Sequence, residues 1–70
     1  MSIAVRINGA EAKVAESASI IEILRGQGLD PAARGLAVAL NEAILPSARW
    51  EATKVAAGDR IEIVKAFAGG

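Results

Sequence analysis

The residues of this chain whose types and order suggest chemistry are the last four, Phe67-Ala68-Gly69-Gly70. Glycine lacks a Cβ, so two successive glycines can pass through a narrow groove and adopt backbone angles closed to other residues. They also leave the terminal carboxylate sterically open. Four extended residues span about 13 Å at most, which is far enough to enter another protein's active site. The sequence therefore predicts a flexible tail over residues 67–70 that presents its carboxylate to a partner; the alternative is a terminus of small residues without a role.

The amino-acid composition excludes most other kinds of functional site. The 70 residues include no cysteine and no histidine. The chain therefore has no disulfide, no thiolate nucleophile and no zinc–thiolate site, and it lacks the commonest general base and metal ligand. Pairs of carboxylates such as Glu11 with Glu16 are expected to be solvated surface charges. We expect no catalytic residue, no metal site and no bound cofactor, so the chain is expected not to be an enzyme.

The charge balance argues against nucleic acid and membranes as partners. Eight lysines and arginines balance eight acidic residues, and the basic residues are scattered singly along the chain. No apolar run approaches the roughly 20 residues of a membrane span. The first six residues enter an alternating pattern directly and lack the layout of a signal peptide. The expectation is a small, soluble, cytoplasmic protein that is monomeric when free.

A hairpin is predicted at the start of the sheet that must position the tail. Apolar residues alternate with others over residues 3–7, which is the period of a half-buried strand. Asn8-Gly9 is a strong turn signal because both residues tolerate positive φ. Residues 12–15 are expected to form the returning strand, after a loop near residues 9–11.

A second hairpin is predicted in the middle of the chain. Residues 36–40 alternate large and small side chains, and residues 43–45 return after the two-residue turn Asn41-Glu42. Pro46 ends this hairpin because proline cannot donate a hydrogen bond to the ladder. One helical turn follows, and its Trp50, the single tryptophan, is expected to close one end of the core.

One helix and a final strand complete the pattern. Ser19 and Glu22 match a capping box, with the serine as N-cap and the glutamate reaching back to the serine backbone. The helix is predicted over residues 20–27, with one apolar stripe. Residues 53–55 are expected to form a brief edge strand. Residues 61–67 are predicted to form the last strand, which runs almost directly into the two glycines.

These elements predict an α+β fold with one domain over residues 1–70. A single helix that covers one face of a mixed, four- or five-stranded sheet is the compact arrangement of this order. If the first and last strands pair in the middle of the sheet, the crossover through the helix is expected to be right-handed. That arrangement is the β-grasp, or ubiquitin-like, architecture.

Alternation along the strands also predicts a binding surface on the face that the helix does not cover. Small or apolar side chains alternate there with charged ones, and such a contiguous patch often marks an interaction site. The expected members of this patch are Ala4, Arg6, Ala37, Ala39, Glu62, Val64 and Ala66. A partner that docks on the patch would receive the tail, because the last strand leads from one to the other.

An ordered set of motifs resembles the ThiS family, the sulfur carrier proteins of thiamine biosynthesis. The set consists of Ile7-Asn8-Gly9, residues 19–24, Val38-Ala39-Leu40-Asn41, Leu45-Pro46, Trp50, Gly58-Asp59-Arg60-Ile61-Glu62-Ile63-Val64 and Ala66-Phe67-Ala68-Gly69-Gly70. The likeness covers nearly the whole chain. This sequence departs from it at Glu42, where many relatives have glycine after the asparagine, so the geometry of that turn is in question.

The resemblance implies a carrier mechanism. An E1-like adenylating enzyme would use ATP to convert the Gly70 carboxylate to an acyl-adenylate. A sulfur donor that bears a persulfide would then convert the adenylate to a thiocarboxylate, and thiazole synthase would take the sulfur. In this scheme Gly70 carries the sulfur and Gly69 provides access, while Ala68 and Phe67 set the exit of the tail.

Three other functions fit part of the same pattern. The small subunit of molybdopterin synthase is similar in fold and ending, but it is usually longer and lacks the stretch from Pro46 to Trp50. A ubiquitin-like modifier would join its C-terminus to lysines of other proteins. A β-grasp interaction module would have no chemistry at its end.

Overall fold

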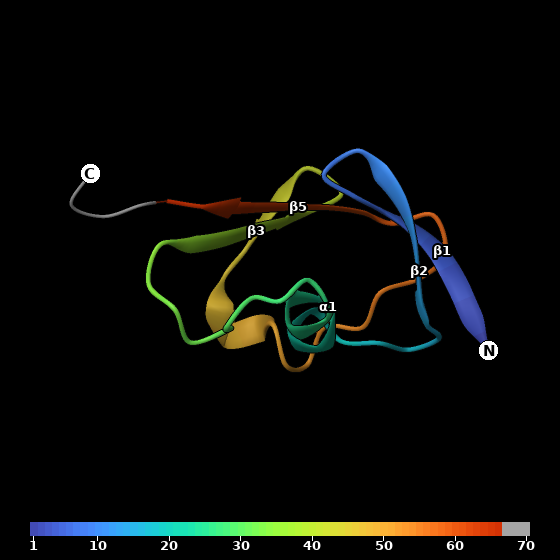
Figure 1. Cartoon of the computed structure of the whole chain (residues 1–70), viewed down its shortest axis with the longest axis horizontal. Coiled ribbons are helices and arrows are strands. Elements are labelled where there is room, and N and C mark those ends of the chain that lie inside the picture. Colours follow the sequence, from blue (N-terminus) through green and yellow to red (C-terminus); the bar gives the residue numbers. More distant parts are fainter. Residues whose placement is uncertain (67–70) are drawn as a thin grey trace.

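Five strands, one α-helix and one 3₁₀ turn make up the chain in the computed structural model, which describes residues 1–66 (Figure 1). In chain order these elements are β1 (Ser2–Ile7), β2 (Ala10–Ala15), α1 (Ile20–Gly26), β3 (Leu36–Leu40), β4 (Ala43–Leu45), the 3₁₀ turn η1 (Ser47–Arg49) and β5 (Arg60–Lys65). The tail predicted over residues 67–70 lies outside the described residues. Within residues 1–66, no helix has the length and apolar character needed to cross a membrane.

The strands form one mixed sheet in the order β2-β1-β5-β3-β4. The first and last strands, β1 and β5, are parallel neighbours at its centre, and the other neighbouring pairs are antiparallel. Helix α1 lies against one face of the sheet, as Figure 1 shows. The predicted α+β, β-grasp arrangement is therefore confirmed, including the central pairing of the first and last strands.

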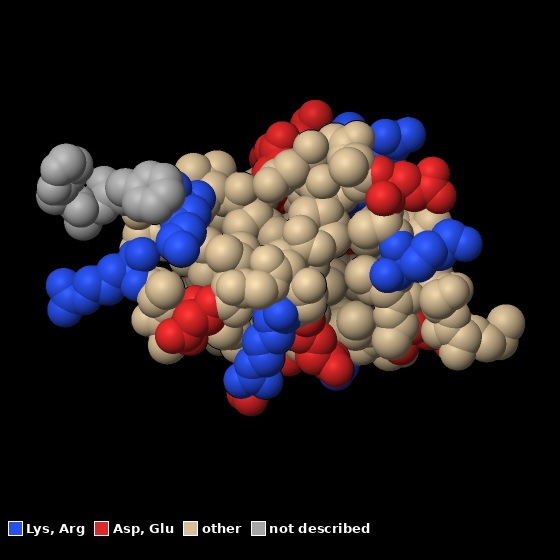
Figure 2. All heavy atoms as spheres, viewed as in Figure 1, with Lys and Arg blue, Asp and Glu red and all other residues tan. Residues whose placement is uncertain are grey.

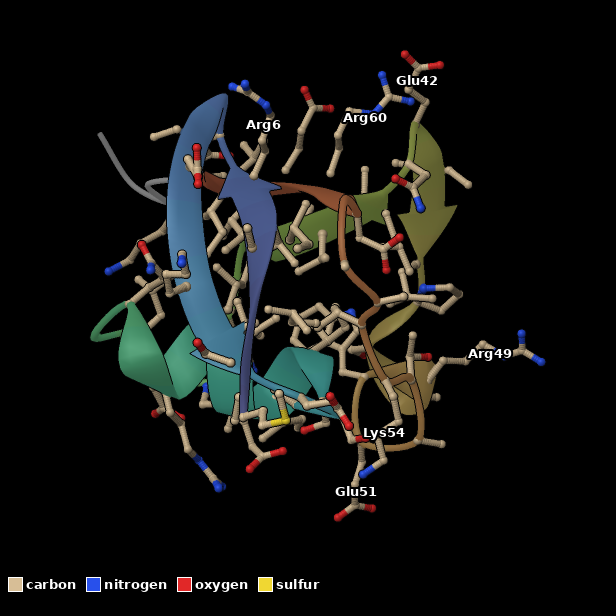
Figure 3. The ribbon with its side chains drawn as sticks, turned by 90° about the vertical axis from the view of Figure 1, so that its right-hand side faces the viewer. Arg6, Glu42, Arg49, Glu51, Lys54 and Arg60 are labelled. Atoms are coloured by element: carbon tan, nitrogen blue, oxygen red, sulfur yellow. The ribbon has the colours of Figure 1, made fainter. Side chains whose placement is uncertain are left out.

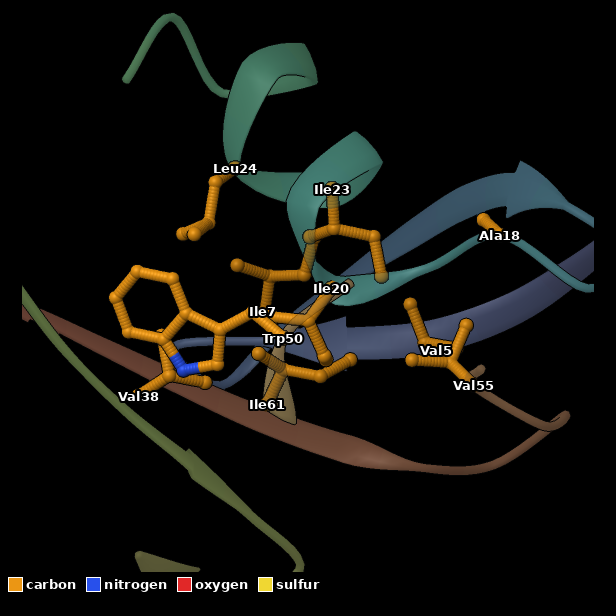
Figure 4. Close-up of a cluster of buried hydrophobic side chains, with 10 residues drawn as sticks. All are labelled: Val5, Ile7, Ala18, Ile20, Ile23, Leu24, Val38, Trp50, Val55 and Ile61. Atoms are coloured by element: carbon orange, nitrogen blue, oxygen red, sulfur yellow. The ribbon is translucent and has the colours of Figure 1, made fainter. Parts of the chain in front are cut away.

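The core lies between the sheet and α1 (Figure 4). Its members come from three strands, the helix and two connecting segments: Val5, Ile7, Ala18, Ile20, Ile23, Leu24, Val38, Trp50, Val55 and Ile61. Full burial of one such large aliphatic side chain stabilises the fold by about 1.5–3 kcal/mol. Val5 and Ile61 are both buried, whereas Arg6 and Val64 were predicted on the opposite face. The predicted inward and outward faces of the first and last strands are therefore correct.

Trp50 closes the core beside η1. Its side chain is 3% exposed, and its indole Nε1 donates a hydrogen bond to the carbonyl of Leu45 at 2.9 Å. A buried tryptophan needs such a partner for its N–H. The interpretation of Trp50 as a core residue is therefore confirmed.

Some boundaries differ from the predictions. Helix α1 begins after Ser19, whose capping box with Glu22 is present, but it ends at Gly26, with Gln27 as C-cap. Strand β2 begins at Ala10, because Asn8-Gly9 closes the hairpin in two residues with φ of +51° and +84°. The predicted loop near residues 9–11 is therefore wrong, since residues 10 and 11 pair with β1.

Two further predictions along the sheet are corrected. The predicted edge strand at residues 53–55 is reduced to an isolated bridge between Ser19 and Lys54. Strand β5 spans Arg60–Lys65 rather than residues 61–67. It begins earlier because Arg60 pairs with Arg6 on β1, and Ala66 lies beyond the last pair with β3.

Candidate functional site

The central strand β5 leads to the end of the described chain, and backbone contacts fix the point where it stops. The N–H of Ala66 donates to the carbonyl of Gly35 at 2.8 Å. Gly35 has φ of +79°, and a Cβ at this position would lie 2.7 Å from the carbonyl oxygen of Ala66. Only glycine fits such an approach, so Gly35 fixes the position of the backbone at Ala66, the last described residue.

Asn8 holds the middle of β5. Its backbone N–H donates to the carbonyl of Ile61 at 2.9 Å, and its side-chain Oδ1 accepts from the N–H of Ile63 at 2.8 Å. The residue register between β1 and β5 covers two pairs, Arg6 with Arg60 and Ile7 with Ile61. The side chain of Asn8 therefore adds one hydrogen bond to β5 beyond the two residue pairs of this short parallel ladder.

Asn41 holds the start of β5 from the other side. Its N–H donates to the carbonyl of Arg60 at 2.7 Å, and its Oδ1 accepts from the N–H of Arg60 at 2.9 Å. Its Nδ2 donates to Oδ1 of Asp59 at 3.1 Å. Like Asn8, it has positive φ, here +50°. The turn with Glu42 keeps its two-residue form despite the missing glycine, because Glu42 adopts φ of +73°.

Sequence reasoning identified both asparagines as turn residues and missed their contacts to β5. The available signal was that each hairpin turn begins with asparagine. This residue tolerates positive φ and also carries an amide that can pair with a backbone group. The two asparagines and Gly35 together position the strand that carries the C-terminal residues.

The predicted binding patch is partly assembled by the structure. Ala37 pairs with Val64 and Ala39 pairs with Glu62, so these four residues are neighbours on β3 and β5. Val64 is 61% exposed, which is unusual for a large apolar side chain on a central strand. Ala66 is also exposed and follows β5 directly.

Ile44 belongs to this patch and was missed from the sequence. It lies on β4 opposite Ala39 and is 78% exposed. The short strand 43–45 gives too few alternations to show which face a residue occupies. We call Ala37, Ala39, Ile44 and Val64 the open-face patch, because these exposed or half-buried apolar residues lie on the side of the sheet opposite α1.

Charged residues lie at the end of the open-face patch where β5 begins. Figure 3 shows Arg6, Arg60 and Glu42 projecting from the sheet on the side away from α1. Arg60 and Glu42 form an exposed ion pair with an N–O distance of 3.6 Å, which contributes about 0–1 kcal/mol at such a surface. Figure 2 views the sheet largely edge-on and so shows a neighbouring side of the molecule, where charged side chains lie mostly around the outline and uncharged atoms fill the middle.

Ala4 lies apart from the rest of the predicted patch. It is half-buried, and its carbonyl accepts a hydrogen bond from the N–H of Gly58 at 2.8 Å, before β5 begins. The parallel register places Arg6 beside Arg60, so Ala4 and Val64 are separated along the sheet by most of the length of β5. The structure therefore brings together the predicted residues on β3 and β5, with Arg6 at their margin.

A metal site or a buried polar site would draw on the acidic and buried polar side chains of the described residues. Among residues 1–66 there is no cluster of acidic side chains that could hold a metal ion, and no buried side-chain polar atom lacks a partner. Hydrogen bonds from the backbone and side chain of Ser19 lower the pKa of Glu22, with smaller contributions from Lys54 and Arg25. Glu22 is the third helical residue and belongs to the capping box of α1, so its lowered pKa follows from the cap.

A mixed five-stranded sheet with parallel first and last strands at its centre and one helix against one face is the β-grasp fold, which defines the ubiquitin-like class. Comparison with known families then identifies the member: the model of the ThiS family matches residues 4–70. The crystal structure of a thiamine biosynthesis protein (ThiS) from Geobacter metallireducens has a TM-score of 0.80 and 30% identity, over 97% of this chain and 100% of that one. The chain belongs to the ThiS family of sulfur carrier proteins.

A solution structure of a thiamine biosynthesis protein from Geobacter metallireducens is also similar. It matches with a TM-score of 0.78 and 30% identity, over 97% of this chain and 88% of that chain. A search of curated protein sequences gave no match. The predicted tail residues Phe67, Ala68, Gly69 and Gly70 fall within the family match but outside the described residues.

Proposed function

We propose that this protein carries sulfur as a thiocarboxylate on Gly70 and delivers it to thiazole synthase in thiamine biosynthesis. The observation that carries the proposal is the family match, which extends through Gly70 and includes the whole of β5, the strand that Asn8, Asn41 and Gly35 position. The two similar structures are a crystal and a solution structure of one thiamine biosynthesis protein from Geobacter metallireducens, which favours the thiazole pathway.

The chemistry begins with an outside enzyme, because an α-carboxylate with a pKa near 3.5 is ionised at neutral pH and is a poor electrophile. In an E1-like adenylating enzyme, the Gly70 carboxylate oxygen attacks the α-phosphorus of ATP, forms an acyl-adenylate and releases pyrophosphate. The terminal sulfur of a donor persulfide then attacks the acyl carbon and expels AMP. A thiol cleaves the resulting acyl disulfide, which leaves the thiocarboxylate on Gly70 and a disulfide on the donor. The carrier itself binds no cofactor and catalyses no step.

The open-face patch is the proposed docking surface for the adenylating enzyme. Val64 and Ile44 offer exposed apolar area, and Ala37 and Ala39 leave the sheet flat between them. A partner seated there contacts β5 directly and receives the residues that follow Ala66. Gly69 is proposed to pass through the entrance of the partner's active site, as a residue without a Cβ can. Neither nucleic acid nor a membrane takes part in this scheme, and the cytoplasm is the proposed location.

Val64→Asp tests this docking surface. An unpaired charge buried in a protein contact is costly, so we expect the KM for the carrier in ATP–pyrophosphate exchange to rise about tenfold or more, with little change in kcat. Ala48→Asp on the exposed 3₁₀ turn is the matched control and should leave KM unchanged. An unchanged KM for a folded Val64→Asp protein would show that the adenylating enzyme binds another surface.

The acceptor is tested separately with thiocarboxylated protein. We expect thiazole synthase to consume the sulfur, with the Gly70 carboxylate regenerated, and the large subunit of molybdopterin synthase to leave it in place. Transfer to the molybdopterin enzyme alone would assign the carrier to that pathway. An amide bond between Gly70 and a lysine of another protein would indicate a ubiquitin-like modifier instead.

A further inference from the structure

Strand β2 lies at one edge of the sheet and offers its full six-residue length for pairing with another strand. The opposite outer strand, β4, has three residues and is followed by Pro46, which limits pairing with another chain. In contrast, β2 has six residues and contains neither proline nor glycine. An outer strand of this kind presents a row of backbone groups that another strand can pair with.

The hydrogen-bond pattern shows which groups of β2 face outward. The N–H of Glu16 donates to the carbonyl of Met1 at 2.8 Å, so this pair belongs to the hydrogen-bonded set of the antiparallel ladder with β1. Hydrogen-bonded pairs alternate along such a ladder. The backbone groups of Ala12 and Val14 therefore point toward β1, and those of Glu11 and Lys13 point toward the free edge.

The sequence of β2 is complementary to itself. If two copies of β2 pair antiparallel with Ala12 opposite Ala12, Glu11 of each copy lies opposite Lys13 of the other. The outward backbone groups of Glu11 and Lys13 then form the hydrogen-bonded pairs that this register requires. On the face toward α1, Ala10 lies opposite Val14. Both opposite-charge pairs and apolar pairs directly across a ladder are stabilising.

The charges of Glu11 and Lys13 favour this register over the neighbouring registers. A shift of the second copy by two residues in either direction places Lys13 opposite Lys13 or Glu11 opposite Glu11, and like charges directly opposite are destabilising. A shift by one residue sets outward backbone groups against inward ones and breaks the ladder. The edge therefore favours a second copy of this chain in one defined arrangement.

Apolar surface next to the edge supports the same pairing. A hollow of about 290 Å³ lies between β2 and α1, and its lining includes Ala12, Val14, Ala18 and Ile23. Because Ala12 and Ala10 of a second copy fall opposite Ala12 and Val14 on this face, pairing adds two small apolar side chains beside the hollow. Burial of apolar surface then adds to the ladder hydrogen bonds and the charge pairs.

We propose that two copies of this protein associate through β2, with Ala12 at a twofold axis perpendicular to the sheet. The two five-stranded sheets become one sheet of ten strands. One short strand per copy buries less than the roughly 1,200–2,000 Å² of a stable interface, so the dimer forms only at high protein concentration. The open-face patch and the end of β5 stay accessible, because β2 lies on the far side of β1 from both. The proposal does not depend on the proposed function, and it refines the expectation of a free monomer.

Charge exchange at the edge tests the proposal. Sedimentation equilibrium of the full chain at low salt measures the dimer dissociation constant. We expect Glu11→Lys alone, and Lys13→Glu alone, to raise that constant about tenfold or more, because two opposite-charge pairs become like-charge pairs. The double variant restores both pairs with reversed signs and should return the constant to near that of the unchanged chain. An equimolar mixture of the two single variants should also associate.

Backbone pairing is tested independently of charge. Lys13→Pro removes an N–H at the free edge, where proline is tolerated within a folded sheet, and should abolish association while the circular dichroism stays unchanged. In the unchanged chain, amide NMR shifts of Glu11 and Lys13 should move on dilution. A chain that stays monomeric at millimolar concentration, a double variant that does not recover association, or dilution shifts confined to another face would each overturn the proposal.

Discussion

Replacement of Gly35 by alanine tests the structural basis of the chain's exit from the sheet. The change has two separable costs. A left-handed φ of +79° costs a non-glycine residue about 1 kcal/mol, and the added Cβ would lie 2.7 Å from the backbone oxygen of Ala66. Relief of that overlap requires a backbone shift, which adds about 1–3 kcal/mol. We expect Gly35→Ala to lower the free energy of unfolding by about 2–4 kcal/mol.

Gly58→Ala is the matched control for this prediction. Gly58 has φ of +86°, and nothing lies within 4 Å of a Cβ placed there, so it carries the first cost without the second. Because 1 kcal/mol corresponds to about 4–8 °C in Tm for a domain of this size, the two variants should differ by at least about 4 °C in thermal unfolding. Hydrogen exchange should also show faster exchange of the Ala66 amide in Gly35→Ala alone. Equal Tm values and equal protection of Ala66 in the two variants would refute the role assigned to Gly35.

Three further predictions concern the cap of α1 and the hold on β5. Ser19→Ala should lower the free energy of unfolding by about 1 kcal/mol through the lost cap, measured by urea denaturation; no loss would mean that the capping hydrogen bonds do not stabilise the helix. Since the pKa of Glu22 is lowered in the folded protein, its contribution to stability is fully present above the unfolded value of about 4.3 and is lost as pH falls through the folded pKa. Glu22→Gln should therefore flatten the fall of stability on the acid side, and an unchanged pH profile would contradict this. Asn8→Gly keeps the positive φ but removes the hydrogen bond to Ile63, so it should lower the free energy of unfolding by about 1 kcal/mol. Asn8→Ala adds backbone strain and should lower it by about 2 kcal/mol. Equal stability of both variants and the unchanged chain would show that Asn8 does not stabilise β5.

The features that local patterns specify were predictable from the sequence. Alternation placed Val5 and Ile61 in the core, and the serine–glutamate spacing located the start of α1. Each of these depends on neighbours within a few residues, where side-chain period and capping chemistry decide the outcome. The α+β arrangement followed from the same elements, because one helix can cover only one face of such a sheet, whereas the central pairing of the first and last strands entered the prediction as a condition.

The contacts that position β5 could not be predicted in the same way. The hydrogen bond between Asn8 and Ile63 joins residues 55 apart in sequence, and no local pattern names the distant N–H that an asparagine will meet. The close approach of Gly35 to Ala66 is likewise visible only after the strands are placed. The exposed position of Ile44 depends on the pairing of β4 with Ala39, which a three-residue strand does not reveal.

The most direct test of sulfur loading on Gly70 is intact-mass analysis. The protein is measured after incubation with ATP, an E1-like adenylating enzyme and a persulfide sulfur donor. We expect a mass increase equal to the exchange of one carboxyl oxygen for sulfur, with fragmentation that places the sulfur on Gly70. Omission of ATP, or one extra residue after Gly70, should abolish the increase and leave the fold intact. An unchanged mass under the complete conditions, or sulfur on any other residue, would contradict the assignment of Gly70 as the site that carries sulfur.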